Sequence, residues 1–122
     1  MDENMKARHF EMIKDEHARA LYESLCAECA RAHGALSPGA QSIIGDIAMM
    51  EQEKRRLYED IASRGINVRV KNGKQDFYRE NQSIAAARAL ADQQRRHLNE
   101  LKLTPASQKT GSASQGDEFE EF

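Results

Sequence analysis

Two cysteines and a histidine have the spacing that most directly suggests chemistry. Cys26 and Cys29 form a Cys-x-x-Cys pair in a strongly helical stretch, and His33 follows one turn later, so all three can share a helix face. Zinc needs about four ligands and usually a second Cys/His pair, which this sequence lacks. We expect no metal site and interpret both cysteines as small buried packing residues; a thiol or zinc sensor is the alternative.

Motifs for catalysis are missing from the sequence. The Gly73-Lys74 pair is followed by Gln and lacks the spacing of a phosphate-binding loop. The carboxylates fall mainly on predicted solvent faces, which disfavours a nuclease-like metal cluster. The histidines are scattered along the chain, at His9, His17, His33 and His97. We therefore predict a protein that is not an enzyme and uses no cofactor.

Basic side chains suggest a different chemistry, the neutralisation of DNA phosphates. The best group lies on and beside a predicted turn that could project from an assembly: Arg69, Lys71, Lys74 and Arg79. Phosphate contacts need only accessible cations, so binding would depend strongly on salt and weakly on base sequence. Lys6 and Arg8 are weaker candidates because acidic residues lie among them. The alternative interpretation is an ordinary solvated hairpin.

The C-terminal segment has the composition of a flexible acidic tail, over residues 104–122. Ser, Gln, Gly and Thr dominate it until the last six residues, which are Asp117, Glu118, Phe119, Glu120, Glu121 and Phe122. A short induced helix would place Phe119 and Phe122 on one side. We predict that these six residues dock into a basic, apolar groove of a partner; a solubilising end is the alternative.

Length and charge fit one helical domain over residues 1–103 followed by that tail. The chain has 122 residues, no Trp and a mean hydropathy of -0.79, so a single copy buries only a modest core and self-association is expected. No apolar run is long enough for a membrane span. Residues 66–103 carry eight basic and four acidic side chains, whereas 104–122 carry one and four. This asymmetry suggests two different partners.

Two long helices are predicted in the first half of the chain. Residues 3–33 contain strong helix formers without Pro or Gly, and we interpret them as one helix, with a possible break near Asp15. Ser37-Pro38 opens a second helix over 37–64. This second helix carries a heptad stripe made of Ile43, Ile47, Met50, Leu57 and Ile61, with Lys54 at the remaining position. We expect the helix to pack on the first helix and on a neighbouring subunit. An intramolecular hairpin alone is the alternative.

A short β-hairpin and a third helix are predicted next. Ile66, Val68 and Val70 alternate with polar residues, and Asn72-Gly73 is a strong turn signal, which gives a hairpin over about 66–78. A third, amphipathic helix should run over 82–102, until Thr104-Pro105 ends it.

Several motifs occur in order between Gly65 and Ser107: Gly-Ile-Asn-Val, a polar turn ending in Asn-Gly, Asn81, a helix carrying Gln94-Arg95, and Leu-Lys-Leu-Thr-Pro-Ala-Ser from Leu101. This order resembles phage terminase small subunits, in which a helical hairpin precedes a glycine, a short variable hairpin and an asparagine that opens the next helix. That helix ends in a Leu-Gly-Leu-Thr-Pro-x-Ser-like motif. The resemblance covers roughly residues 36–107, and departs at Gln82, where Pro is frequent, and at Lys102, where a small residue is usual.

The resemblance implies a homo-oligomeric ring of roughly eight to twelve copies. It also implies binding to double-stranded viral DNA, and control of a large terminase subunit with ATPase and nuclease activities, in the cytoplasm of the infected bacterial host. The predicted fold is all-α with a minor β-hairpin, in which a long helical hairpin and a third helix assemble as that ring. A protein-only helical adaptor without DNA binding is the alternative function.

Overall fold

The fold is helical with one small β-hairpin, as expected. A computed structural model describes residues 1–104; all of the expected tail except Thr104 lies outside them. The elements are α1 (Glu3–Met12), α2 (Glu16–His33), α3 (Pro38–Arg64), β1 (Asn67–Asn72), β2 (Gln75–Glu80) and α4 (Gln82–Glu100). Within residues 1–104, no helix is both long and apolar enough to cross a membrane. The ring assembly stays a prediction.

The expected first helix over 3–33 is two helices, because the chain turns between Met12 and Glu16. The Asp15 carboxylate caps α2 by accepting a hydrogen bond from the backbone N–H of Ala18, at 2.8 Å. Gln52 of α3 satisfies the backbone groups that the break frees: its Oε1 accepts from the N–H groups of Lys14 and Asp15, and its Nε2 donates to Met12 O. The break is therefore stabilised by α3.

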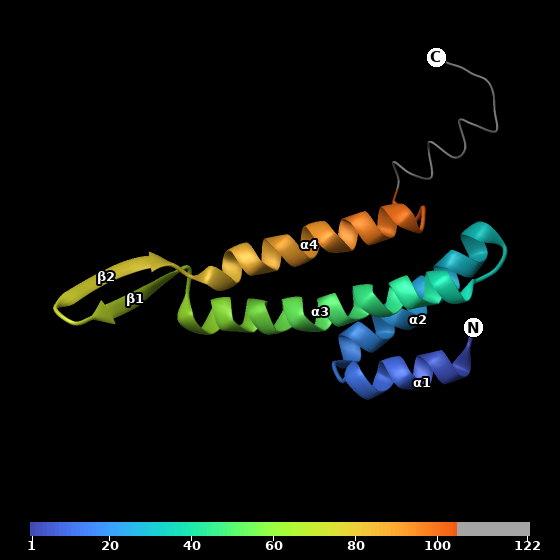
Figure 1. The fold of residues 1–122 in the computed structure, drawn as a ribbon, viewed down its shortest axis with the longest axis horizontal. Helices are drawn as coiled ribbons and strands as arrows, with labels where there is room; N and C mark the ends of the chain where they lie inside the picture. Colours follow the sequence, from blue (N-terminus) through green and yellow to red (C-terminus); the bar gives the residue numbers. More distant parts are fainter. Residues whose placement is uncertain (105–122) are drawn as a thin grey trace, which may run out of the picture.

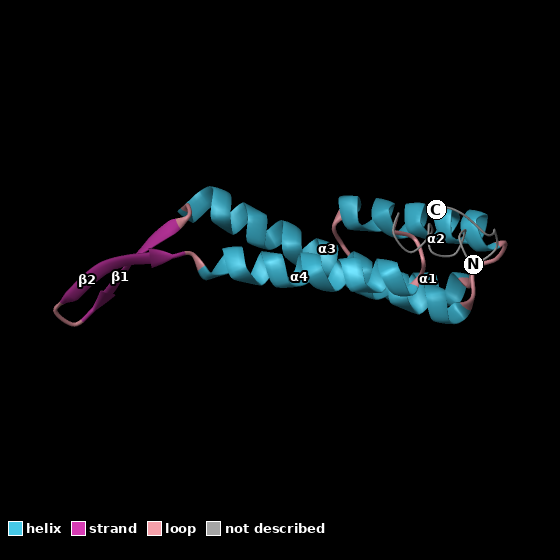
Figure 2. Ribbon diagram, turned by 90° about the horizontal axis from the view of Figure 1, so that it is seen from above, coloured by secondary structure: helices cyan, strands magenta, loops and turns pink. Residues whose placement is uncertain are grey.

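The long helices α3 and α4 lie side by side and carry different structures at their two ends (Figure 1). At one end α1 and α2 pack against α3, and the core forms there around Ile13, Tyr22 and Ile44, all fully buried. At the other end the β-hairpin extends beyond the helices (Figures 1 and 2). The fold thus holds the hairpin away from its own core.

The heptad stripe on α3 contacts both the first helical segment, as expected, and α4: Ile47 lies in the core with Tyr22 of α2, and Ile43 packs against that core. Lys54, on this stripe, donates to Gln94 Oε1 of α4 at 2.7 Å, and Gln94 donates back to Ile47 O at 3.2 Å. Ile44 and Ala48, outside the stripe, are buried in the same core beside Tyr22. Among the stripe residues Ile47 is buried, whereas Ile43, Met50, Leu57 and Ile61 are half-buried. Their role in an oligomer interface stays a prediction.

Candidate nucleic-acid interface

The projecting hairpin carries four of the six residues that we consider for DNA binding. Its strands pair antiparallel, with Val68 opposite Arg79, Val70 opposite Phe77, and Arg69 opposite Tyr78. The loop consists of Gly73 and Lys74, one residue later than the Asn72-Gly73 turn that the sequence suggests, and in it only Gly73 has a positive φ, of 62°. Strand geometry places directly paired residues on the same face.

The hairpin therefore has two different faces. Val68, Val70, Phe77 and Arg79 share one face, which we call the apolar face. The opposite, polar face carries Arg69, Lys71, Asp76 and Tyr78. The basic cluster expected from the sequence is thus divided, because Arg79 lies on the apolar face, Arg69 and Lys71 lie on the polar face, and Lys74 lies in the loop.

The cations of the hairpin also differ in their electrostatic partners. The Arg69 guanidinium forms a two-point ion pair with the Asp76 carboxylate across the strands and lowers the pKa of Asp76. This pair neutralises the charge of Arg69 locally. Lys71, Lys74 and Arg79 are exposed and have no ion-pair partner among residues 1–104. These three residues, which we call the free hairpin cations, are the ones available for phosphate.

The other two candidate cations lie on α1, beside the core and far from the hairpin (Figure 1). Lys6 pairs with Glu23 of α2 at 3.1 Å, and its ammonium lies 5.3 Å from the centre of the Phe10 ring. Arg8 is exposed and has no ion-pair partner in the described part of the chain. The structure therefore separates the two candidate DNA sites and does not combine them.

A polar cluster at the base of the hairpin fixes its two ends, and we call it the junction cluster: Asp60, Arg64, Asn81 and Ser83. Asn81 is fully buried; its Oδ1 accepts from the N–H of Ser83 and its Nδ2 donates to Gly65 O and to Asp60. Its own N–H donates to Ile66 O at 2.6 Å. Asn81 thus caps α4 and ties the start of β1 to the end of β2.

The Asp60 carboxylate is the main hydrogen-bond acceptor of the junction cluster. Arg64 donates to both carboxylate oxygens, at 2.6 and 2.9 Å, and the Ser83 hydroxyl donates at 2.6 Å. These hydrogen bonds, that of Arg64 first, hold the pKa of Asp60 well below its ordinary range. The sequence predicts Asn81 as the residue that opens α4. It does not single out Asp60 and Arg64 as site residues, although their i,i+4 spacing is a signal for a helical ion pair.

The cysteines pack inside the protein instead of forming a reactive site. Cys26 and Cys29 are buried, and burial raises the pKa of Cys26 to about 11 and that of Cys29 in the same direction. Both thiols are therefore protonated at neutral pH. Within residues 1–104, no group of three or more His, Cys, Asp or Glu side chains is placed to hold a metal ion.

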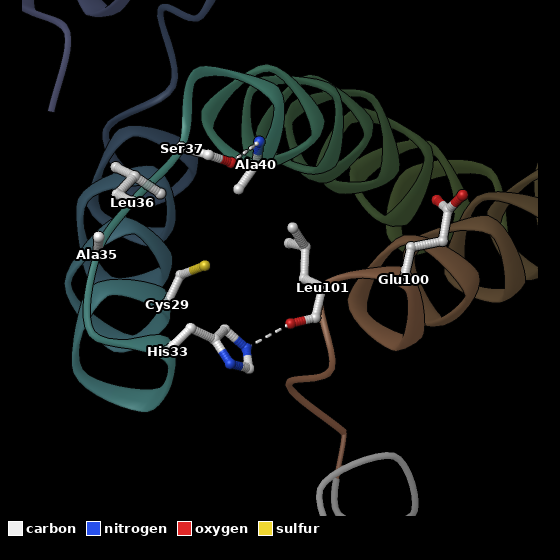
Figure 3. Close-up of a pocket in the computed structure, with 8 residues that line it drawn as sticks. All are labelled: Cys29, His33, Ala35, Leu36, Ser37, Ala40, Glu100 and Leu101. Atoms are coloured by element: carbon white, nitrogen blue, oxygen red, sulfur yellow. Dashed lines mark hydrogen bonds between the residues drawn. The ribbon is translucent and has the colours of Figure 1, made fainter. Parts of the chain in front are cut away.

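Cys29 and His33 line a depression of about 370 Å³ between the ends of α2 and α4 and the start of α3 (Figure 3). The Cys29 thiol points into it, whereas the His33 ring turns to the Leu101 carbonyl, with Nε2 2.7 Å from the oxygen. His33 therefore ties the end of α2 to the end of α4.

Comparison with known proteins identifies the family. The family model described as phage terminase, small subunit, matches residues 18–118. No curated protein and no solved structure matches the chain. The match covers most of the chain, including the hairpin, the junction cluster and α4. The chain therefore belongs to the phage terminase small subunit family, whose role is in the packaging of phage DNA.

Proposed function

We propose that this protein is a non-catalytic terminase subunit that binds double-stranded viral DNA and recruits or regulates the large terminase subunit during packaging. It acts in the cytoplasm of the infected bacterial host, as a homo-oligomeric ring of about eight to twelve copies. Family membership supports the packaging role. The observation that supports DNA binding is the hairpin, which extends beyond the helices and carries three free cations.

The binding mechanism is electrostatic and multivalent. Lys71 on the polar face and Lys74 in the loop reach phosphate oxygens without competition from an internal carboxylate. One hairpin offers few contacts, so its affinity alone is weak. A ring repeats the contact, and each bound hairpin raises the effective concentration of the next one at the DNA.

Replacing Lys71 and Lys74 together with alanine should weaken duplex binding about tenfold at low salt. The slope of log affinity against log salt should fall by roughly two per engaged subunit, because each lost phosphate contact releases about one counterion fewer. Fluorescence anisotropy with a labelled duplex across a salt series measures both quantities. The matched control is Arg88→Ala with Arg96→Ala, which removes the same charge from exposed positions of α4.

The control decides where DNA binds. Equal losses in the two double variants would mean diffuse attraction and would contradict the hairpin site. A loss confined to Lys6→Ala with Arg8→Ala would move the site to α1. Wild-type protein that shows no salt-sensitive retention of DNA would favour the protein-only adaptor.

We propose that the acidic C-terminal residues contact the large subunit. The last six residues combine two Phe side chains with four carboxylates, and they are Asp117, Glu118, Phe119, Glu120, Glu121 and Phe122. Such a segment fits a groove that is both apolar and basic, where the rings are desolvated and the carboxylates meet cations. The residues lie outside the described part of the chain, so the proposal depends on the sequence alone.

Deleting residues 117–122 should weaken binding to the large subunit by about tenfold or more, since two buried aromatic side chains contribute at least that much. Isothermal titration calorimetry with the purified large subunit measures the affinity, and native mass spectrometry should give an unchanged copy number. Phe119→Ala with Phe122→Ala should reproduce most of the loss, whereas Glu120→Gln with Glu121→Gln should mainly change its salt dependence. Unchanged affinity in the deletion variant would overturn the docking role.

A further inference from the structure

The apolar face of the hairpin is only partly covered within residues 1–104. Val68 and Val70 are half-buried, and Phe77 is 43% exposed although it is a large aromatic side chain. The sheet has only two strands, and it extends beyond the ends of α3 and α4 (Figures 1 and 2). A two-stranded hairpin is marginal in water unless an apolar face is covered. This face therefore fits a surface of another molecule.

A shallow groove that is also largely apolar lies between α3 and α4. Its volume is about 270 Å³, and Met49, Met50 and Leu90 provide its apolar surface. Asp46 and Glu53 also line it. Methionine side chains adapt their shape to an inserted ring and make favourable contacts between sulfur and the aromatic edge. The groove is thus suited to an aromatic side chain accompanied by a cation.

The apolar face of the hairpin and the groove carry complementary charges. Arg79 lies two residues from Phe77 on the same face and has no ion-pair partner among residues 1–104. Asp46 at the groove is exposed and forms no ion pair in the described structure, although its carboxylate interacts electrostatically with His9 of α1. Glu53 is held in an exposed i,i+3 pair with Arg56. When Phe77 enters the groove, Arg79 is positioned to meet Asp46, and an apolar contact gains an ion pair at its rim.

The occupant of the groove is a second copy of this chain. The hairpin of the same copy cannot reach it, because the strands lead away from the helices that form the groove (Figure 2). We infer that the apolar face of one copy, with Phe77 and Arg79, docks into the groove formed by Met49, Met50 and Leu90 of the next copy, beside Asp46. The inference rests on the proposed homo-oligomer and is independent of DNA binding.

This contact has two consequences for the assembly. The hairpin and the groove lie in different parts of the chain, so each copy can insert its hairpin into one neighbour and receive the hairpin of another. Such head-to-tail contacts close into a ring when the rotation between copies allows it. The docked hairpin also turns its polar face outward, which leaves Lys71 and Lys74 accessible.

Site-specific cross-linking of the full-length protein tests the inference. Phe77→Cys chains and mass-tagged Met50→Cys chains are mixed, unfolded and refolded together, and oxidised. A disulfide between chains of different mass should dominate the product, because docking brings the two positions together. The matched control is Tyr78→Cys with Met50→Cys, since Tyr78 is the neighbouring residue on the opposite face. The native Cys26 and Cys29 are 1% and 3% exposed, so they compete little.

Charge reversal provides a second readout that does not depend on cysteines. Arg79→Glu and Asp46→Arg should each raise the concentration for half-assembly about tenfold, and the two substitutions combined should recover most of the loss. Circular dichroism should show the same helix content in all variants.

The wild-type protein separates failure of this inference from failure of the proposed ring. Native mass spectrometry should give a closed assembly of about eight to twelve copies. One outcome is that the assembly forms while the yield of disulfide between Phe77→Cys and Met50→Cys chains does not exceed that of the Tyr78→Cys control. In that case the hairpin contacts some other surface and the inference is wrong. A wild-type monomer would overturn the inference and the ring together.

Discussion

Replacing Asn81 with alanine should lower the free energy of unfolding by about 2 to 4 kcal/mol, the sum of a lost helix cap and of buried groups left without partners. Cap loss alone costs about 1 kcal/mol. The remainder comes from Gly65 O, which loses the Nδ2 donor, and from the fully buried position of the side chain. Urea denaturation followed by circular dichroism measures the change.

The matched control for this prediction is Gln82→Ala. Gln82 is the next residue, the first of α4, and it is exposed with no hydrogen bond through its side chain among residues 1–104. Its replacement should change stability by less than about 0.5 kcal/mol, as at other surface sites. If both variants lose the same stability, the effect belongs to the start of α4 and not to the asparagine.

Asn81→Ala should also loosen the hairpin more than the helices. Its side chain joins Gly65, before β1, to Ser83, after β2, so its loss releases both ends of the hairpin. Backbone amides of β1 and β2 should then exchange hydrogen faster, while those in the core around Tyr22 stay protected. Unchanged exchange in the strands would contradict a positioning role for the junction cluster.

The order of elements could be predicted from the sequence because each has a local signal. Ser37-Pro38, Gly65 and Asn81 mark element ends through capping and backbone preference, and the structure uses them in that way. The break after Met12 was harder to place, since the residues favour helix throughout. What stabilises it is Gln52, which is nearly forty positions away in the sequence, and no local pattern reveals that contact.

The candidate site was predicted only as a list of charges. Arg69, Lys71 and Arg79 are close in sequence, but the strand register decides which of them share a face. The same register places Asp76 beside Arg69, and their ion pair is the reason that Arg69 is not one of the free hairpin cations. A prediction made from spacing alone therefore overstates the size of a basic patch on a hairpin.

One departure from the family motif has a local physical meaning. Lys102, where the family usually has a small residue such as glycine, has a φ of 57°, in the left-handed region. The N–H of Leu103 donates to Leu98 O and that of Lys102 to Asn99 O, which closes the end of α4. Glycine adopts this conformation without strain, which accounts for the residue that the motif prefers. The chain keeps the turn with lysine at some energetic cost.

Replacing Gly45 with alanine should release α1 from the rest of the protein and lower the free energy of unfolding by about 1 to 3 kcal/mol. A Cβ atom at this position would lie 2.3 to 2.6 Å from three atoms of the His9 ring, so helix and ring cannot both stay in place. His9 is not free to rotate away at no cost, because its Nδ1 lies 2.7 Å from the Tyr22 hydroxyl, which also accepts a hydrogen bond from Gln41. Hydrogen exchange and limited trypsin digestion at Lys6 and Arg8 should both detect an opened α1.

Gly39→Ala is the control that isolates this close approach. Gly39 lies in the first turn of the same helix, and a Cβ there would meet no atom within 4 Å, so the variant gains helix propensity, about 1 kcal/mol at most, without the clash. If Gly45→Ala keeps α1 protected, the contact with His9 does not hold the helix. Gly45→Ala also distinguishes the two candidate DNA sites. Because α1 and the hairpin lie far apart, an opened α1 should leave duplex affinity unchanged if the hairpin binds DNA, and should alter it if Lys6 and Arg8 do.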